Sequence, residues 1–135
     1  MAPHQPTKYR NRPIWECVAC RTPQDFAPGE KKECDHCHSD GFRRFDSQAE
    51  WRRWRVLRDM EQHGEISDLT CQGRWPLIVS GIHVAYYQSD FDYTRDGQRV
   101  VEDVKGGQAT RTAAYKLKNR LFWACWGIHI QEVSG

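Results

Sequence analysis

The sequence predicts an α/β domain built on a mixed central sheet flanked by helices, together with a small zinc ribbon. From residue 46 onward the patterns run helix, three or four strands, helix and strand, which is typical of a sheet covered by helices. Upstream, two Cys-x-x-Cys pairs lie in a segment with almost no aliphatic residues. The chain has 135 residues, 39% of them apolar, which suits one ordinary domain with a small appendage.

The composition limits where the protein acts but does not decide its partner. A net charge of +2 neither requires nor excludes nucleic acid, because a basic face can be hidden in a balanced total. The chain has no apolar run of 18 residues and no apolar segment near its N-terminus, so we expect no membrane span and no secretory signal. We therefore expect a cytoplasmic protein, in which paired cysteines bind metal more often than they form disulfides.

The cysteine pairs are the most specific local pattern. Thirteen residues separate the first pair from the second, slightly fewer than is usual for a zinc ribbon. Each pair can fold as a knuckle that presents two thiolates, and two knuckles complete a tetrahedral shell with no open position. We therefore predict a structural zinc, with His36 and His38 as alternative ligands. The predicted ligands are Cys17, Cys20, Cys34 and Cys37.

Three segments are expected: a flexible basic tail over residues 1–13, the zinc ribbon over 14–44, and the α/β core over 45–135. The tail carries three basic residues and can touch a phosphate backbone. Without metal, the ribbon has too little to bury to fold by itself. It would grip either DNA or a protein partner.

The first predicted helix begins at Asp46-Ser47, where Ser47 and Glu50 fit a capping box, and it ends at His63-Gly64. Glu50 has two interpretations. It can simply cap the helix, or it can reach toward a metal ion held by the strands. The arginines that follow are expected to face mostly outward, either as a solvated face or as a track for phosphates.

The remaining elements follow from alternation, turn residues and helical periodicity. Gly73 and Pro76 are expected to break the chain, and Arg95-Asp96-Gly97 is expected to form a hairpin turn. Residues 77–84 are expected to form a hairpin or a sharply bent strand. The other predicted elements are strands at 65–72, 85–93, 100–105 and 128–133, and a helix at 113–126 ended by Gly127.

The strand at 100–105 carries the strongest chemical pattern. Side chains alternate along a strand, so Val101, Asp103 and Lys105 share one face. Pairing across the hairpin turn brings Asp90 toward Asp103, whereas Asp92 lies nearer the turn. The alternative is an edge strand that carries a solvated Asp/Lys pair.

These residues carry a resemblance to a known superfamily. Asp90, twelve residues, and then Asp103-Val104-Lys105 resembles the bipartite signature of the PD-(D/E)XK nucleases, and Glu50 matches an acidic residue on their first helix. A longer ordered set, from Phe45-Asp46-Ser47 to Gly127-Ile128, is similar to a phage-encoded family long catalogued as a domain of unknown function. The likeness covers residues 45–133.

Two departures from the family pattern stand out. Ser89 replaces the proline of the signature, which is common in the superfamily and harmless to the chemistry. The cysteine segment looks like an inserted zinc ribbon. The resemblance implies a PD-(D/E)XK restriction-endonuclease-like core.

The resemblance also implies roles for individual residues. Asp90, Asp103 and the carbonyl of Val104 would hold catalytic Mg²⁺ or Mn²⁺, and Lys105 would orient the attacking water and stabilise negative charge. Glu50 would bind a second ion or the hydration shell of the first. Gln72 would either neighbour the site or be merely a residue at a strand end. The residues expected to contact DNA phosphates are Arg52, Arg53, Lys116 and Lys118.

The resulting hypothesis is a Mg²⁺-dependent DNA endonuclease, acting in the host cell cytoplasm if the chain is phage-encoded. By analogy of fold, it would be a structure-selective homodimer that cuts branched DNA, such as a Holliday-junction resolvase. One alternative is a non-catalytic zinc-ribbon DNA-binding or adaptor protein. Another is a nuclease subunit that requires a partner.

Overall fold

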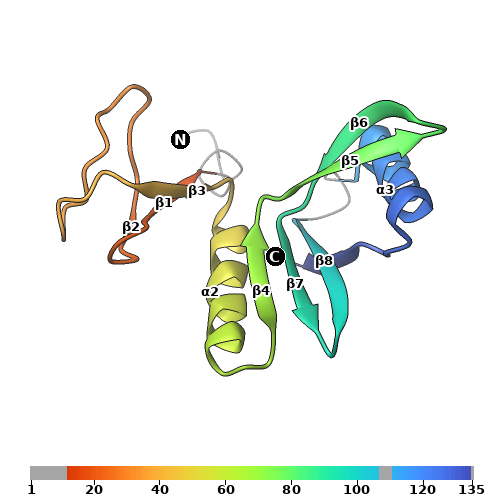
Figure 1. Ribbon diagram of the computed structural model, residues 1–135. Coiled ribbons are helices and arrows are strands. Elements are labelled where there is room, and N and C mark those ends of the chain that lie inside the picture. The colour runs from red at the N-terminus through yellow and green to blue at the C-terminus, as the bar shows by residue number, and fades with distance from the viewer. Residues whose placement is uncertain (1–11, 107–110, 135) are drawn as a thin grey trace, which may run out of the picture. The chain divides into compact units, whose positions relative to one another are not determined.

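The computed structural model describes residues 12–106 and 111–134 (Figure 1). The expected basic tail, apart from its last two residues, lies outside the described residues, as does Gly107. The chain divides into two compact units, Met1–Arg52 and Arg53–Gly135. Among the described residues, no helix combines the length and the apolar character needed to cross a bilayer.

The first unit contains a three-stranded antiparallel sheet in the order β2-β1-β3. The strands are β1 (Ile14–Cys17), β2 (Pro23–Gln24) and β3 (Phe42–Phe45). The Phe26 ring lies edge-on to the rings of Trp15 and Phe42, with centroids 6.4 and 4.9 Å apart. Among its described residues, the buried apolar side chains are Phe45, Cys17 and Cys34, which form only a very small core.

Helix α2 (Gln48–Gln62) begins and ends where its capping residues predict. The backbone N–H of Glu50 donates to Ser47 Oγ at 3.2 Å, so the serine half of the predicted capping box is confirmed. Gly64, with φ of 77°, follows the last turn in the left-handed conformation that glycine adopts readily.

The second unit is built on a four-stranded mixed sheet in the order β4-β7-β8-β9. Only the β8–β9 pair is parallel, so the predicted mixed sheet is confirmed. The hairpin turn predicted at Arg95-Asp96-Gly97 is confirmed: Arg95 pairs with Gln98, and Asp96 and Gly97, with φ of 51° and 77°, form the loop between β7 and β8. The strands are β4 (Ser67–Cys71), β7 (Phe91–Arg95), β8 (Gln98–Lys105) and β9 (Gln131–Ser134).

A separate hairpin joins β5 (Arg74–Val79) to β6 (Ile82–Gln88), as expected for the segment around residue 80. The predicted chain break at Pro76 is wrong, because Pro76 lies inside β5 opposite Tyr86. A two-stranded ribbon has unpaired outer edges, so a residue without an N–H is tolerated there.

The single strand predicted over residues 85–93 is two strands. The chain changes partners at Ser89 and Asp90, from β5 on one side to β4 and β8 on the other. Backbone hydrogen bonds hold this junction: Ser89 N–H donates to Gly73 O at 3.0 Å, and Gln72 N–H donates to Asp90 O at 2.9 Å.

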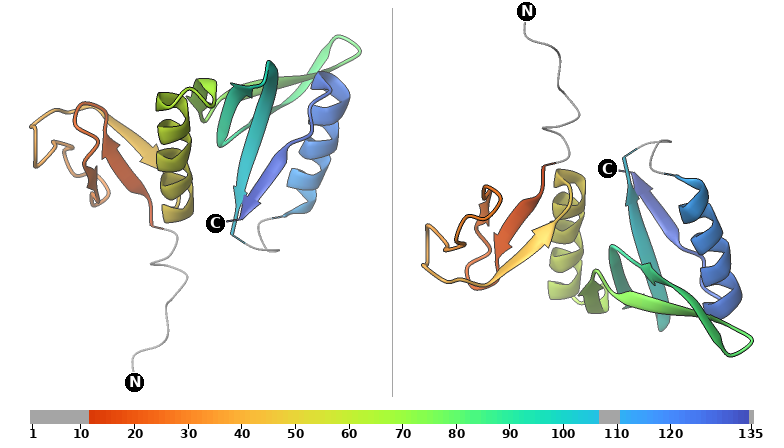
Figure 2. Two further views of the ribbon diagram at one scale, coloured as in Figure 1. Left: turned by 90° about the horizontal axis from the view of Figure 1, so that it is seen from below. Right: turned by 90° about the horizontal axis from the view of Figure 1, so that it is seen from above.

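Helix α3 (Ala113–Trp126) packs on β5 and β6 (Figure 2). Its Phe122 belongs to the main core. The predicted bounds are confirmed, with Thr112 Oγ1 accepting a hydrogen bond from Tyr115 N–H and Gly127 in the left-handed region. The last strand begins at residue 131 and not at 128 as expected. The intervening segment instead joins the core, which comprises Leu77, Tyr87, Val101, Phe122 and Ile130.

Strand β8 is buried on both of its faces. Val101 packs in the α3 core, whereas the next residue, Glu102, is only 1% exposed and faces α2. Glu102 accepts two hydrogen bonds from Arg53, at 2.8 and 2.7 Å, and a third from the hydroxyl of Tyr93. Burial and Glu102 raise the pKa of Tyr93 to about 12, so this hydroxyl remains a donor at neutral pH.

Arg53 therefore differs from the expectation that it faces outward. Its guanidinium neutralises the buried carboxylate of Glu102 and attaches α2, from Arg53 onward, to the sheet. The stacked rings of Trp54 and Phe91, with centroids 6.0 Å apart, support the same contact.

Replacing Glu102 with Gln is predicted to destabilise the protein strongly. The change removes the negative charge that compensates Arg53, and breaking a buried ion pair costs about 3 kcal/mol. Denaturant unfolding monitored by circular dichroism measures the loss. Glu65→Gln, at an exposed carboxylate, is the matched control and is expected to change stability by less than about 0.5 kcal/mol. Equal stability of the two variants would contradict the role assigned to the ion pair.

Candidate functional site

The two cysteine pairs fold as matching knuckles. Arg21 N–H donates to Cys17 O at 2.8 Å, and His38 N–H donates to Cys34 O at 2.9 Å. The residue that closes each knuckle has a positive φ, 67° at Arg21 and 63° at His38. Each Cys-x-x-Cys pair is thus wrapped by the same tight turn, which directs both of its sulfur atoms to one side.

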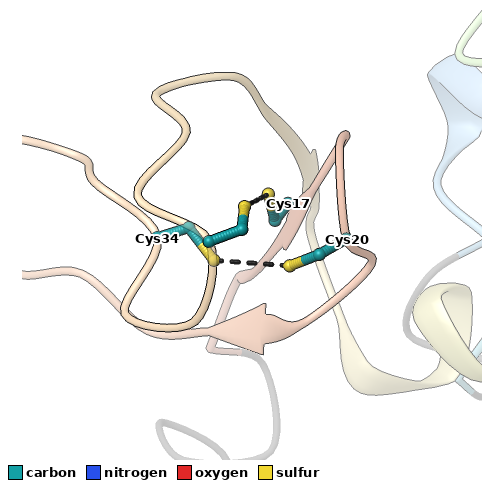
Figure 3. A group of neighbouring side chains, drawn as sticks. Cys17, Cys20 and Cys34 are labelled. Carbon is teal, nitrogen blue, oxygen red and sulfur yellow. Dashed lines mark hydrogen bonds between the residues drawn. The ribbon is translucent and has the colours of Figure 1, made fainter.

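The four sulfur atoms converge (Figure 3). Sγ atoms are 3.5 Å apart between Cys17 and Cys37 and between Cys20 and Cys34, and all four lie within 4.8 Å of one another. A tetrahedral zinc with Zn–S bonds of about 2.3 Å places its ligands about 3.8 Å apart, so this group fits the ion. The four predicted cysteines therefore form a possible metal-binding site, and four thiolates are consistent with structural zinc.

The alternative histidine ligands do not join this group. In the part of the chain that the structure describes, the converging ligand atoms belong to the cysteines alone. His38 instead places Nδ1 3.2 Å from a carboxylate oxygen of Glu33, and His36 is exposed.

The thiols differ in how readily they lose their protons. Hydrogen bonds from the side chain and backbone of Ser39 lower the pKa of Cys37 to about 6, so one thiolate exists at neutral pH. At Cys17, a backbone hydrogen bond from Cys20 lowers the pKa, but burial and the neighbouring thiols outweigh it and raise the pKa to about 11. Zinc binding must therefore displace protons, and zinc affinity falls as pH falls.

A second group of polar side chains lies at the C-terminal end of β8. Asp103 and Lys105 share a face, as alternation predicted, and are 9% and 8% exposed. Lys105 Nζ lies 3.3 Å from Asp103 Oδ2, and the Tyr87 hydroxyl donates to the same oxygen at 3.0 Å. Since β8 lies between β7 and β9, the alternative of a solvated pair on an edge strand is wrong.

Tyr87 is held as a hydrogen-bond donor. Burial raises the pKa of Tyr87 far above its ordinary value, and the charge of Asp103 raises it further. A phenol that stays protonated fixes the orientation of the carboxylate beside it.

Lys105 also contacts an aromatic ring. Its Nζ lies 3.4 Å from the ring centroid of Tyr115, in the first turn of α3. The Tyr115 hydroxyl donates to Glu132 Oε2 at 2.9 Å, and Arg111 Nε donates to Glu132 Oε1 at 3.1 Å. The ammonium thus lies between a carboxylate and a ring that is anchored on β9.

Asp90 approaches the same end of β8 from the β6–β7 junction. Its Oδ2 accepts a hydrogen bond from Val104 N–H at 2.7 Å, and its own N–H donates to Glu102 O at 3.2 Å. Gln72, whose N–H donates to Asp90 O, adjoins it through the backbone. Asp90, Asp103 and Lys105 are therefore brought to one strand end.

Asp92 has a different environment. It forms an ion pair with Arg99 and accepts a hydrogen bond from Ser89 Oγ at 3.4 Å. Because Asp92 is committed to these partners, Asp90 is the carboxylate that adjoins the backbone of Val104.

The remaining predicted site residues fall elsewhere. Glu50 lies in the first turn of α2, in the other compact unit, so its approach to Asp90 and Asp103 stays a prediction. Of the residues expected to contact phosphates, Arg52 and Lys116 are exposed, Lys118 is partly exposed, and Arg53 is bound to Glu102.

Zinc content is predicted to follow the four thiols. The purified chain should carry one zinc per molecule by elemental analysis, and Cys34→Ser should lose it because three ligands do not close the shell. Amide hydrogen exchange should then speed up across residues 12–45. Cys125→Ser changes a thiol outside the group and should retain the metal. A full equivalent of zinc in Cys34→Ser would contradict the assignment.

No curated protein matches this chain significantly. A family model described as "Protein of unknown function (DUF1064)" matches residues 30–129, from just before the second cysteine pair to just after α3. Because this match covers well over half of the sequence, the chain belongs to that family of unknown function.

Proposed function

We propose that this protein is a Mg²⁺-dependent DNA endonuclease that hydrolyses phosphodiester bonds on a PD-(D/E)XK-type core. The observation that carries the proposal is the meeting of Asp90, Asp103 and Lys105 at one end of β8, in the order and spacing of that nuclease signature. Asp103 and Lys105 are buried charged side chains that lie with Asp90 at one strand end, and convergent polar groups of this kind mark a candidate functional site.

The carboxylates suit a hard divalent cation. The Tyr87 hydroxyl and the Lys105 ammonium both contact Oδ2 of Asp103, and among the described residues Oδ1 has no hydrogen-bond or ion-pair partner. Asp90 adjoins the peptide of Val104, whose carbonyl would be the third protein ligand. Mg²⁺ binds through one or two carboxylates and keeps several waters, which matches so small a set.

Each residue has a separate task in this proposal. Asp90, Asp103 and the carbonyl of Val104 would hold Mg²⁺, which when bound would supply Lewis-acid activation of water for phosphodiester hydrolysis. Lys105, oriented by Asp103 and the Tyr115 ring, would place its positive charge beside the phosphate oxygens as negative charge develops on them. Tyr87 would keep Asp103 in position as a positioning residue.

Other predicted residues extend the site. Glu50 would bind a second ion or the hydration shell of the first, and Gln72 would neighbour Asp90. Exposed or partly exposed cations would neutralise backbone phosphates, and the candidates are Arg52, Lys116 and Lys118. Arg53 is better explained by its buried partner Glu102 than by a phosphate.

The substrate proposed within DNA is branched, for example a four-way junction, with a homodimer that supplies one site for each strand. This extension is made by analogy of fold and of the phage-encoded family, in which case the protein would act in the host cytoplasm. The zinc ribbon would hold DNA or a protein partner.

A second candidate is a non-catalytic zinc-ribbon DNA-binding protein, or a nuclease subunit that needs a partner. The observation in its favour is that Asp103 already has two donors, Tyr87 and Lys105, with no cation. DNA binding without cleavage in either Mg²⁺ or Mn²⁺ would favour this candidate, and cleavage only with an added protein would favour the subunit.

Asp90→Ala is predicted to reduce cleavage to background, because it removes a metal ligand. Lys105→Ala should slow it about a thousandfold through the loss of charge stabilisation. Rates are measured on linear, nicked, flapped and four-way DNA, each with Mg²⁺ and with EDTA. Asp59→Ala, an exposed carboxylate on α2, is the matched control and should cleave normally. Unreduced cleavage by folded Asp90→Ala would remove Asp90 from the mechanism.

A further inference from the structure

The outward side of α3 carries an unusual row of residues. Lys116, Arg120 and Trp123 are spaced by four and three positions, so they lie on one face of the helix, and all three are exposed. The helix contains three basic residues and no acidic one. We refer to Lys116, Arg120 and Trp123 as the α3 row.

Trp123 is a large ring left open to solvent. It is 47% exposed, and its ring stacks on His129 with centroids 3.8 Å apart and planes 10° apart. Among the described residues, its indole N–H has no hydrogen-bond partner. The stack holds the indole in one orientation without burying it.

Trp126, on the same helix, shows what a structural tryptophan looks like. Its indole N–H donates to Pro76 O at 3.0 Å, and its ring lies edge-on to Trp75 with centroids 5.0 Å apart. Its exposure of 43% is similar, but these contacts attach it to the fold. Contacts within the fold thus explain why a tryptophan stands at position 126, but they do not explain the one at position 123.

The cations of α3 also differ from other cations of the same unit. Arg53, Arg99 and Arg111 each pair with a carboxylate. Within the described part of the chain, Lys116, Lys118 and Arg120 form no ion pair. A row of uncompensated cations beside an aromatic ring complements a polyanion that carries flat rings. It also disfavours a second copy of this chain, because a symmetric contact would oppose like charges.

The row starts beside the candidate site. Tyr115, whose ring contacts Lys105, immediately precedes Lys116 in the first turn of α3. At a rise of 1.5 Å per residue, Trp123 lies about 12 Å along the helix from Tyr115. A single strand leaving the site along α3 would therefore meet the cations first and the aromatic pair afterwards.

We propose that Trp123 and His129 form a stacking platform for an unpaired base of single-stranded DNA, while Lys116 and Arg120 contact its phosphates. Aromatic stacking beside a basic track is the usual way of holding single strands, because every base has a π-face. Bases within a duplex are already stacked, so the platform selects unpaired DNA. The inference rests on the proposed function for the assignment of DNA as substrate, and it specifies which part of that DNA is held.

Binding without cleavage provides the test. A fluorescently labelled single strand and the corresponding blunt duplex are titrated in EDTA with wild type and variants, and anisotropy is followed. Trp123→Ala is expected to weaken single-strand binding about tenfold and to leave duplex binding unchanged. Trp123→Phe, which keeps a stacking ring, should restore most of the affinity. Lys116→Ala should weaken both ligands and reduce the salt slope by about one.

Leu117→Ala is the matched control, because Leu117 is a neighbouring apolar side chain that is 59% exposed and has no π-face. It should bind like wild type. The platform would be overturned if Trp123→Ala bound single strands normally, if it weakened the duplex equally, or if Leu117→Ala had the same effect. Circular dichroism confirms that each variant is folded.

Cleavage and Trp123-dependent binding are separate readouts, because binding is measured in EDTA, where no divalent metal is present. Absence of cleavage together with Trp123-dependent binding would overturn the nuclease and support the platform. Cleavage together with Trp123-independent binding would overturn the platform and support the nuclease.

Discussion

Burial of charge on both faces of β8 is the constraint on which the second unit depends. A charged group removed from water must find an opposite charge or a hydrogen-bond donor, because the cost of leaving it uncompensated exceeds most single packing contacts. Glu102 finds Arg53 on α2, and Asp103 finds Lys105 and Tyr87. Consecutive residues of one strand thereby attach different elements to its two faces.

The helix ends, the hairpin turn and the cysteine knuckles were predicted correctly, because each depends on residues that are close together in the sequence. Ser47 and Gly127 fix helix ends through their own backbone surroundings, and Asp96-Gly97 fixes a hairpin through positive φ angles. The cysteine knuckles likewise depend on short spacings. Two predictions were wrong: the chain break at Pro76 and the unbroken strand through Ser89. Both features depend on which strands pair, because pairing decides whether a proline is tolerated and where a strand ends. Paired strands can be distant in sequence, so a local pattern does not reveal them.

In the candidate site, too, the residues placed by local patterns were predicted and those placed by distant elements were not. Alternation along β8 placed Asp103 and Lys105 together, and pairing across the turn brought Asp90 near them. Tyr115 and Glu132 were not foreseen, since each comes from an element distant in sequence and carries no local pattern. The hydrogen bond that Tyr87 donates to Asp103 depends on the position of β6, which is likewise distant in sequence from β8. The prediction that Arg53 faces solvent was wrong, because a run of arginines on a helix gives no sign that one of them binds the buried Glu102.

The enclosure of Lys105 has a thermodynamic consequence. A free lysine side chain retains about 2 kcal/mol of rotamer entropy, which a flexible surface ammonium gives up only when it captures its anion. In this protein the carboxylate of Asp103 and the ring of Tyr115 already restrict the Lys105 side chain, and only 8% of Lys105 is exposed. The loss of side-chain entropy of Lys105 therefore occurs during folding. An anion that binds this ammonium group does not have to order the side chain again.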